Sequence, residues 1–189
     1  MQLERTTLDG VVTLTPRVFG DNRGSFFESY NATTLAGLGI DTVFVQDNQS
    51  HSADAGTVRG LHFQSPPHAQ AKLVRVLQGE IFDVAVDIRR GSPTYGEWTG
   101  VTLSAENRAQ LLVPAGFLHG FVTRVADCVV AYKCSDTYAP DCEGAVRFDD
   151  ADIGIDWGID AGDAVLSDKD AKAGPLAELE SPFTFEART

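Results

Sequence analysis

Short runs in which apolar and polar residues alternate follow one another along most of the chain. The runs are rich in Val, Ile, Phe and Tyr, and period-two alternation of such residues is typical of β-strands. Gly and Pro turns separate the runs, and no helical pattern alternates with them, so the sequence predicts an antiparallel sandwich or barrel. The expected strands are 11–18, 42–50, 58–63, 71–77, 80–88, 98–103, 109–113, 120–125 and 128–134, with a short one near 145–148.

Two segments have the composition of helices. Residues 31–39 can form one short helix, capped by Asn31 or Thr33 and ended by glycine. In the tail, Ser167 followed by Asp170 resembles a capping box with Asp in place of Glu, so 167–180 is also expected to be helical. We expect this tail to close the site.

Length and charge narrow the class of protein. A chain of 189 residues with 43% hydrophobic and 22% charged residues fits one globular domain, 1–189, with one core. The net charge of -12 argues against a nucleic-acid partner. A few converging Arg and Lys side chains can still bind a small phosphorylated ligand.

The cysteines and the N-terminus indicate a cytoplasmic protein. Cys128, Cys134 and Cys142 are odd in number and lack metal-site spacing, which suits a reducing compartment. Charged residues stand near the N-terminus where a signal peptide needs an apolar run, and no stretch has the length of a membrane span. We therefore expect neither export nor membrane insertion.

Two segments resemble the two sequence blocks of a cupin barrel. The first, 59–83, carries His62 and Lys72, and the second, 113–121, carries His119 in a P-x-G-x-x-H pattern. One histidine per block is too few for a three- or four-ligand metal site, so no metal is expected.

Local pattern alone leaves the role of His62 open, because a histidine on a strand is more often a hydrogen-bonded structural residue. Alternation turns His62 away from the apolar face of its strand. Arg59, Lys72 and Tyr132 are also available, so a base, an acid and a cation can share one cavity.

A series of motifs occurs in order along most of the chain: FGDNRGSFFESYN, FVQDN, RGLHFQ, PPHAQAKLVRVLQGEIFDVAVDIRRGSPTYG, LSAEN, VPAGFLHGF, YKCSDTYAP, GIDW and LSDKDAKA. With these motifs the chain closely resembles the dTDP-4-dehydrorhamnose 3,5-epimerase family. The resemblance implies an all-β, cupin-like antiparallel jelly-roll barrel with a few short peripheral helices, a homodimer, and no metal or organic cofactor. It implies inversion at C3 and C5 of dTDP-4-dehydro-6-deoxy-D-glucose, a step toward dTDP-L-rhamnose.

The resemblance also implies roles for individual residues. His62 matches the proton acceptor with Asp170 as its dyad partner, Tyr132 matches the proton donor, and Lys72 matches the cation beside the C4 carbonyl. Tyr138 matches the aromatic residue that stacks on thymine. The other positions that match ligand contacts are Arg23, Glu28, Gln46, Asp47, Asn48, Arg59, His119, Glu143 and Lys169.

These residue types suit the chemistry. A proton on carbon beside a ketone is weakly acidic, so its removal needs a base and a charge that stabilises the enolate oxygen; Lys72, aided by His119, suits the latter. Reprotonation from the opposite face needs a second group across the ring, and Tyr132 fits. Asp170 would fix the tautomer of His62, although the same residue could simply cap a helix.

Two placements stay open. Alternation puts Arg59 and His62 on opposite faces, so either Gly60 makes a bulge or Arg59 serves the partner subunit's site, and we favour the second. Asp83 could pair with Lys72 across a hairpin, or could form only a polar strand face with Asp87.

Two other functions compete with the double epimerase. One is a relative that inverts only C3 or C5 in another deoxysugar pathway. The other is a non-catalytic sugar-binding cupin, which would be expected to lack the base or the acid. This chain has both His62 and Tyr132.

Overall fold

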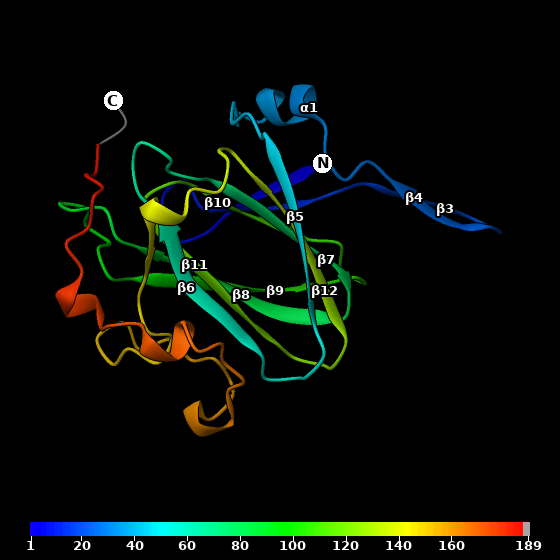
Figure 1. Ribbon diagram of the computed structural model, residues 1–189. Helices are drawn as coiled ribbons and strands as arrows, with labels where there is room; N and C mark the ends of the chain where they lie inside the picture. Colours follow the sequence, from blue (N-terminus) through cyan, green and yellow to red (C-terminus); the bar gives the residue numbers. More distant parts are fainter. Residues whose placement is uncertain (187–189) are drawn as a thin grey trace.

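The computed structural model describes residues 1–186, and its main body is two antiparallel sheets that face one another (Figure 1). The strands of the larger sheet, in their order across it, are β1 (Gln2–Arg5), β2 (Val12–Thr15), β10 (Gln110–Val113), β7 (Lys72–Gln78), β12 (Cys128–Cys134) and β5 (Gln46–Ser52). Those of the smaller sheet are β13 (Glu143–Ala145), β6 (Val58–Gln64), β11 (Phe117–Thr123), β8 (Glu80–Asp87) and β9 (Trp98–Ser104).

From β5 to β8, and again from β9 to β13, consecutive strands alternate between the sheets, as in a cupin-like jelly roll: β5 and β7 belong to the larger sheet, β6 and β8 to the smaller. The expected all-β fold is confirmed. The remaining elements are short: the helix α1 (Ala32–Gly37), the hairpin of β3 (Val18–Asp21) and β4 (Gly24–Phe27), and 3-10 turns at Pro140–Cys142, Ala161–Asp163, Asp170–Lys172 and Leu176–Glu178.

The inner faces of the two sheets form the main core. Val74 and Val76 from β7 pack with Ile81 and Ala85 from β8 and with Phe121 from β11. This apolar cluster occupies only part of the space between the sheets, because polar residues occupy other inward positions of the same strands. The cavity described below lies among those polar positions.

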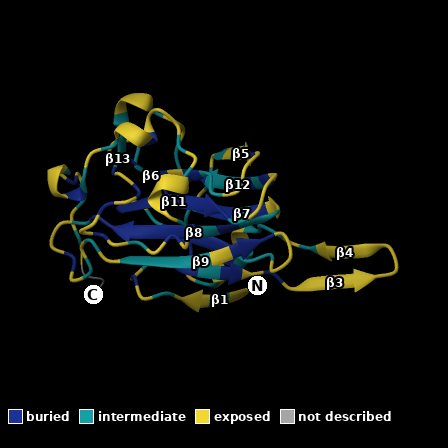
Figure 2. Ribbon diagram, turned by 90° about the horizontal axis from the view of Figure 1, so that it is seen from below, coloured by how far each residue is buried: buried dark blue, intermediate teal, exposed yellow. Residues whose placement is uncertain are grey.

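The smaller sheet is buried on its outer face as well. Val84 and Val86 of β8 pack there against Phe148, Ile153 and Trp157 of the segment after β13. Both faces of β8 are therefore inside the protein, and the strand is drawn largely as buried in Figure 2. Its inward carboxylates, Asp83 and Asp87, are fully buried. A carboxylate in this position needs partners, because burial disfavours its charge.

The β3–β4 hairpin projects away from the body (Figures 1 and 2). Its residues are almost all exposed, and Phe19 and Phe26 expose 53% and 73% of their surface. Arg23 lies at the tip, as the turn residues predict, and within residues 1–186 it pairs only with Asp21, at 2.6 Å.

Several local predictions differ from the structure. The tail does not form a helix and makes only short 3-10 turns, because Gly174 and Pro175 interrupt it and the Asp170 carboxylate is used elsewhere. Residues 42–45 precede β5 and lie outside the strand, and the strand expected at 120–125 begins at Phe117. The helix at 31–39 is confirmed: Asn31 caps it by accepting from Thr33 and Thr34. None of the helices among residues 1–186 could span a membrane.

Candidate active site

Two adjoining hollows of about 400 and 360 Å³ lie between the sheets, and both are lined by His62 and Tyr132. His62 comes from β6 of the smaller sheet and Tyr132 from β12 of the larger sheet. A ligand held between the sheets would therefore meet the imidazole and the phenol on different sides.

A bulge at Gly60 sets the inner face of β6. His119 pairs with His62 and Phe121 pairs with Arg59, so one residue of β11 lies opposite two of β6. Gly60 has φ +127, and a Cβ atom there would lie 2.6 Å from the Gly120 Cα. The bulge brings Arg59 to the second hollow together with His62. The alternative of a bulge is therefore confirmed, and the placement of Arg59 in the partner's site stays a prediction.

His62 is bonded to Asp170, 108 residues farther along the chain, with 2.5 Å between Nε2 and Oδ1. Burial alone would raise the pKa of Asp170, but the hydrogen bond and charge of His62 outweigh it and lower that pKa. A carboxylate accepts, so Nε2 carries the hydrogen and the free lone pair lies on Nδ1.

The predicted capping box of Ser167 and Asp170 forms only in part, which leaves the Asp170 carboxylate available to His62. The backbone N–H of Asp170 donates to the Ser167 hydroxyl at 3.1 Å, which is half of the expected capping box. The carboxylate does not complete the box and turns to His62 instead. The motif is thus confirmed in part, and it positions a functional carboxylate.

Lys72 lines the first hollow and makes no ion pair with any of residues 1–186. Burial lowers the pKa of its ammonium group, opposed by Cys134, Asp83 and Glu143. An ammonium with no direct partner in a cavity is suited to an oxygen that gains negative charge.

His119 lies directly opposite His62 in the sheet and bonds to Asp83, with 2.7 Å between Nε2 and Oδ1. Both side chains are buried. Burial lowers the pKa of His119, and Asp83 opposes the shift. The second oxygen of Asp83, Oδ2, is buried without any hydrogen-bond partner among the described residues.

A chain of polar contacts crosses the mouth of the first hollow. The Glu143 carboxylate accepts from the Tyr138 hydroxyl at 2.8 Å and pairs with Lys169 at 2.5 Å. Burial would raise the pKa of Glu143, but these two partners lower it. Tyr138 is 58% exposed at this rim, and its backbone N–H donates to Gln46.

Most of the predicted site residues meet in these hollows: Gln46, Asn48, His62, Lys72, Tyr132, Tyr138 and Glu143 line the first, and Arg59, His62, Tyr132, Lys169 and Asp170 line the second. Four predicted contacts do not. Arg23 is on the hairpin tip, Glu28 bonds to Asn31 and Thr34 beside α1, and Asp47 points outward to Lys133. The fourth, His119, is buried against Asp83 and does not line either hollow.

Asp83 is the residue that the sequence predictions left out of the site. Its alternation with Asp87 was a usable signal, because two carboxylates on the inward face of a β-branched strand need partners. Gln64 is a second omission. It donates to the carbonyls of His68 and Thr137 and accepts from the N–H of Ala139, so it anchors the loop that carries Tyr138.

Within residues 1–186, no group of three or more His, Cys, Asp or Glu side chains is placed to hold a metal ion. The site contains two pairs, each of one imidazole and one carboxylate: His62 with Asp170, and His119 with Asp83. Such pairs can move protons and stabilise charge.

The sequence matches the family model of dTDP-4-dehydrorhamnose 3,5-epimerase over residues 5–178. A dTDP-4-dehydrorhamnose 3,5-epimerase of Methanothermobacter thermautotrophicus is 49% identical over 175 residues, covering 92% of this chain and 94% of the relative.

Two solved structures are informative neighbours. The dTDP-6-deoxy-D-glucose-3,5-epimerase of Legionella pneumophila, in complex with dTDP-4-keto-L-rhamnose, is 44% identical with a TM-score of 0.93, covering 98% of this chain and 99% of that one. A 3'-monoepimerase of Streptomyces bikiniensis, in complex with dTDP-quinovose, is 34% identical with a TM-score of 0.84, covering 91% and 86%.

Proposed function

We propose a mechanism for this chain, which belongs to the dTDP-4-dehydrorhamnose 3,5-epimerase family and converts dTDP-4-dehydro-6-deoxy-D-glucose to dTDP-4-dehydro-L-rhamnose. The observation that carries the mechanism is the His62–Asp170 pair on one sheet, facing Tyr132 on the other. Inversion of a carbon centre requires proton removal on one face and proton delivery on the other, which this arrangement supports.

His62 is the base. Asp170 accepts the Nε2 hydrogen, which leaves the Nδ1 lone pair to take the proton from C3 or C5 of the 4-keto sugar. The C–H electron pair becomes the carbon–carbon double bond of the enolate, and the C4 oxygen takes the negative charge. Asp170 stabilises the imidazolium that forms, because it is a buried anion at hydrogen-bond distance.

Lys72 stabilises the enolate oxygen. Its ammonium group faces the first hollow without a direct ion pair, so the developing charge at C4 can become its partner. Asp83 and His119 help to keep this group charged. The negative charge of Asp83 raises the pKa of Lys72, and Asp83 is fixed by its hydrogen bond to His119.

Tyr132 returns a proton to the opposite face of the ring. Burial raises the pKa of its phenol, so the group is protonated at neutral pH and can act as the acid. At the rim, Tyr138 is available to stack on the thymine, and Arg59 in the second hollow is available to the diphosphate.

We also propose a cytoplasmic homodimer. The β3–β4 hairpin exposes Phe19 and Phe26, and β5 is an edge strand of the larger sheet among the described residues, so a second copy can cover both surfaces. In such a dimer Arg23, which is far from the cavity of its own chain, can reach the partner's nucleotide. Light scattering tests the assembly, and a fully active monomer would contradict it.

The mechanism is tested by incubating the 4-keto sugar nucleotide with enzyme in D2O and following product by NMR. Wild type should incorporate deuterium at both C3 and C5. His62→Ala should lose turnover by about 100-fold or more while still binding dTDP. Label at C3 alone would indicate a mono-epimerase, and an active His62→Ala enzyme would exclude His62 as the base.

A further inference from the structure

We infer that Asn48 positions the catalytic acid: its side-chain amide donates to the Tyr132 oxygen and holds the phenol ready for proton transfer. The inference rests on the proposed role of Tyr132. It assigns Asn48 to the acid, whereas its match to the family implies only a contact with the substrate.

The register of the larger sheet places Asn48 beside Tyr132. These two residues are direct partners in the β12–β5 ladder, and Val74 is the partner of Tyr132 on the other side, in β7. Within this row of the sheet, the only polar side chain next to the phenol is therefore that of Asn48.

The orientation of the Asn48 amide is set by its neighbours. Gln46 donates to the Asn48 oxygen at 3.0 Å, and the Asn48 nitrogen faces Cys134 Sγ at 3.6 Å. Gln46 is itself held by the Tyr138 N–H, at 2.9 Å. Because its oxygen is occupied by Gln46, the amide presents its N–H groups, rather than its carbonyl, to the inner face where Tyr132 lies.

An N–H donor at this position assists the acid. When Tyr132 delivers its proton, the O–H bond breaks, the enolate carbon–carbon π pair forms the new C–H bond, and the phenol becomes a phenolate. Burial and the Cys134 thiol raise the pKa of the phenol, while contact with the Asn48 amide and the charge of Arg59 lower it. Glu143 also acts to raise it. Among these groups that shift the pKa of Tyr132, Asn48 is its direct partner in the β12–β5 ladder.

The test separates the two faces of the reaction. In D2O, His62 can return deuterium to the face from which it took the proton, so exchange without inversion reports the base, and inversion reports the acid. Asn48→Asp keeps the shape and replaces the donor by an acceptor. We expect inversion to fall roughly 10- to 100-fold and exchange to stay within about threefold.

Asn48→Ala removes the donor without adding charge, and should show the same imbalance to a smaller extent. It provides the test if Asn48→Asp folds poorly. Gln78→Glu, the same chemical change at an exposed position of β7, is the matched control and should behave as wild type. Tyr132→Phe is measured in the same assay. If it loses inversion while both Asn48 variants keep it, or if these variants lose exchange and inversion in parallel, the role of Asn48 is wrong; if Tyr132→Phe itself inverts normally, the proposed acid is wrong.

Discussion

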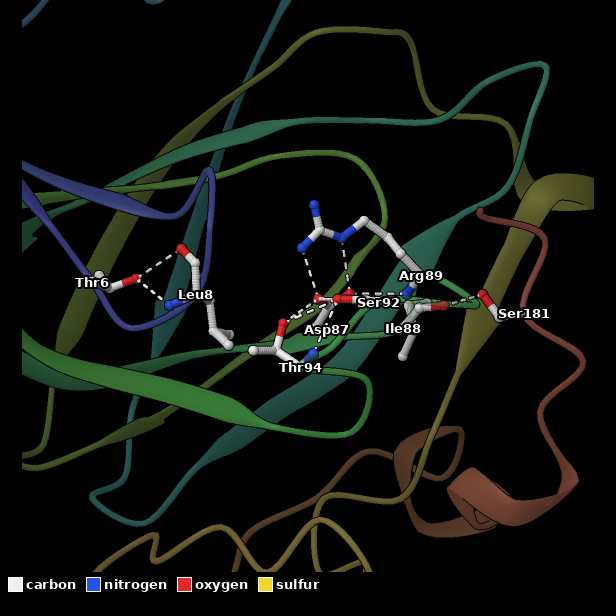
Figure 3. A network of polar contacts seen from close by, with 8 residues as sticks. All are labelled: Thr6, Leu8, Asp87, Ile88, Arg89, Ser92, Thr94 and Ser181. Atoms are coloured by element: carbon white, nitrogen blue, oxygen red, sulfur yellow. Dashed lines mark hydrogen bonds and ion pairs between the residues drawn. The ribbon is translucent and has the colours of Figure 1, made fainter. Parts of the chain in front are cut away.

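Asp83 and Asp87 are four residues apart on β8, face the same side of the sheet and are both fully buried, yet their surroundings differ. Asp87 accepts hydrogen bonds from Arg89, Ser92 and Thr94 (Figure 3). Asp83 accepts one from His119, and its second oxygen has no partner among residues 1–186.

The difference separates a structural carboxylate from one that serves the site. Burial would raise the pKa of Asp87, but its donors outweigh this and lower it, so the network stabilises the charge and fixes the turn after β8. Arg89 also stacks on Phe117 and Phe185, which ties the C-terminal segment to this end of the sheet. Asp83 has fewer hydrogen-bond donors than Asp87, and its negative charge raises the pKa of His119 and of Lys72.

Removing the structural carboxylate should have the largest effect. Asp87→Ala leaves the Arg89 guanidinium and two hydroxyl groups without their acceptor, and should lower the free energy of unfolding by about 3–5 kcal/mol. Urea denaturation measures this, and kcat of the folded fraction should stay within about threefold. Asp149→Ala, which breaks a partly exposed pair with Arg147, is the control and should cost under about 1 kcal/mol. Equal losses in the two variants would contradict the comparison.

Asp83→Asn should show the reverse pattern. We expect kcat to fall about 10- to 100-fold, because the change weakens the enolate-stabilising group without removing it, and stability to change by less than about 1 kcal/mol. Asp83 raises the pKa of Lys72, so its neutralisation should lower that pKa. The enzyme needs the protonated ammonium, so the loss of activity at alkaline pH should begin at a lower pH than in wild type. An unchanged pH profile would remove Asp83 from its supporting role.

Ser92→Ala should have the smallest effect, because it removes one of several donors to Asp87. The expected loss is about 1 kcal/mol at pH 7. The folded pKa of Asp87 lies below its ordinary value, so its stabilisation is complete above about pH 4 and is lost as the pH falls through the folded pKa. The difference between variant and wild type should therefore shrink as the pH falls below the folded pKa of Asp87. A difference that persists there would assign it to packing rather than to the carboxylate.

Much of the protein was predictable from local pattern. Alternation identified most strands of both sheets and turned His62 and Gln64 to the same face, because successive side chains of a strand point to opposite sides. The cap at Asn31 and the turn at Arg23 followed in the same way from residue chemistry. These features depend on neighbours within a few residues, so the amino-acid sequence by itself determined them.

The tertiary structure decided what could not be read locally. The bulge at Gly60 reverses the alternation of β6, and it arises because Gly60 and Gly120 lie so close that neither strand accepts a Cβ there. Asp170 reaches His62 across 108 residues, and Asp83 and Asp87 receive different partners only when β11 and the turn after β8 are in place. Alternation is a property of one strand, whereas the partners of a buried charge depend on which distant segments the closed barrel brings against it.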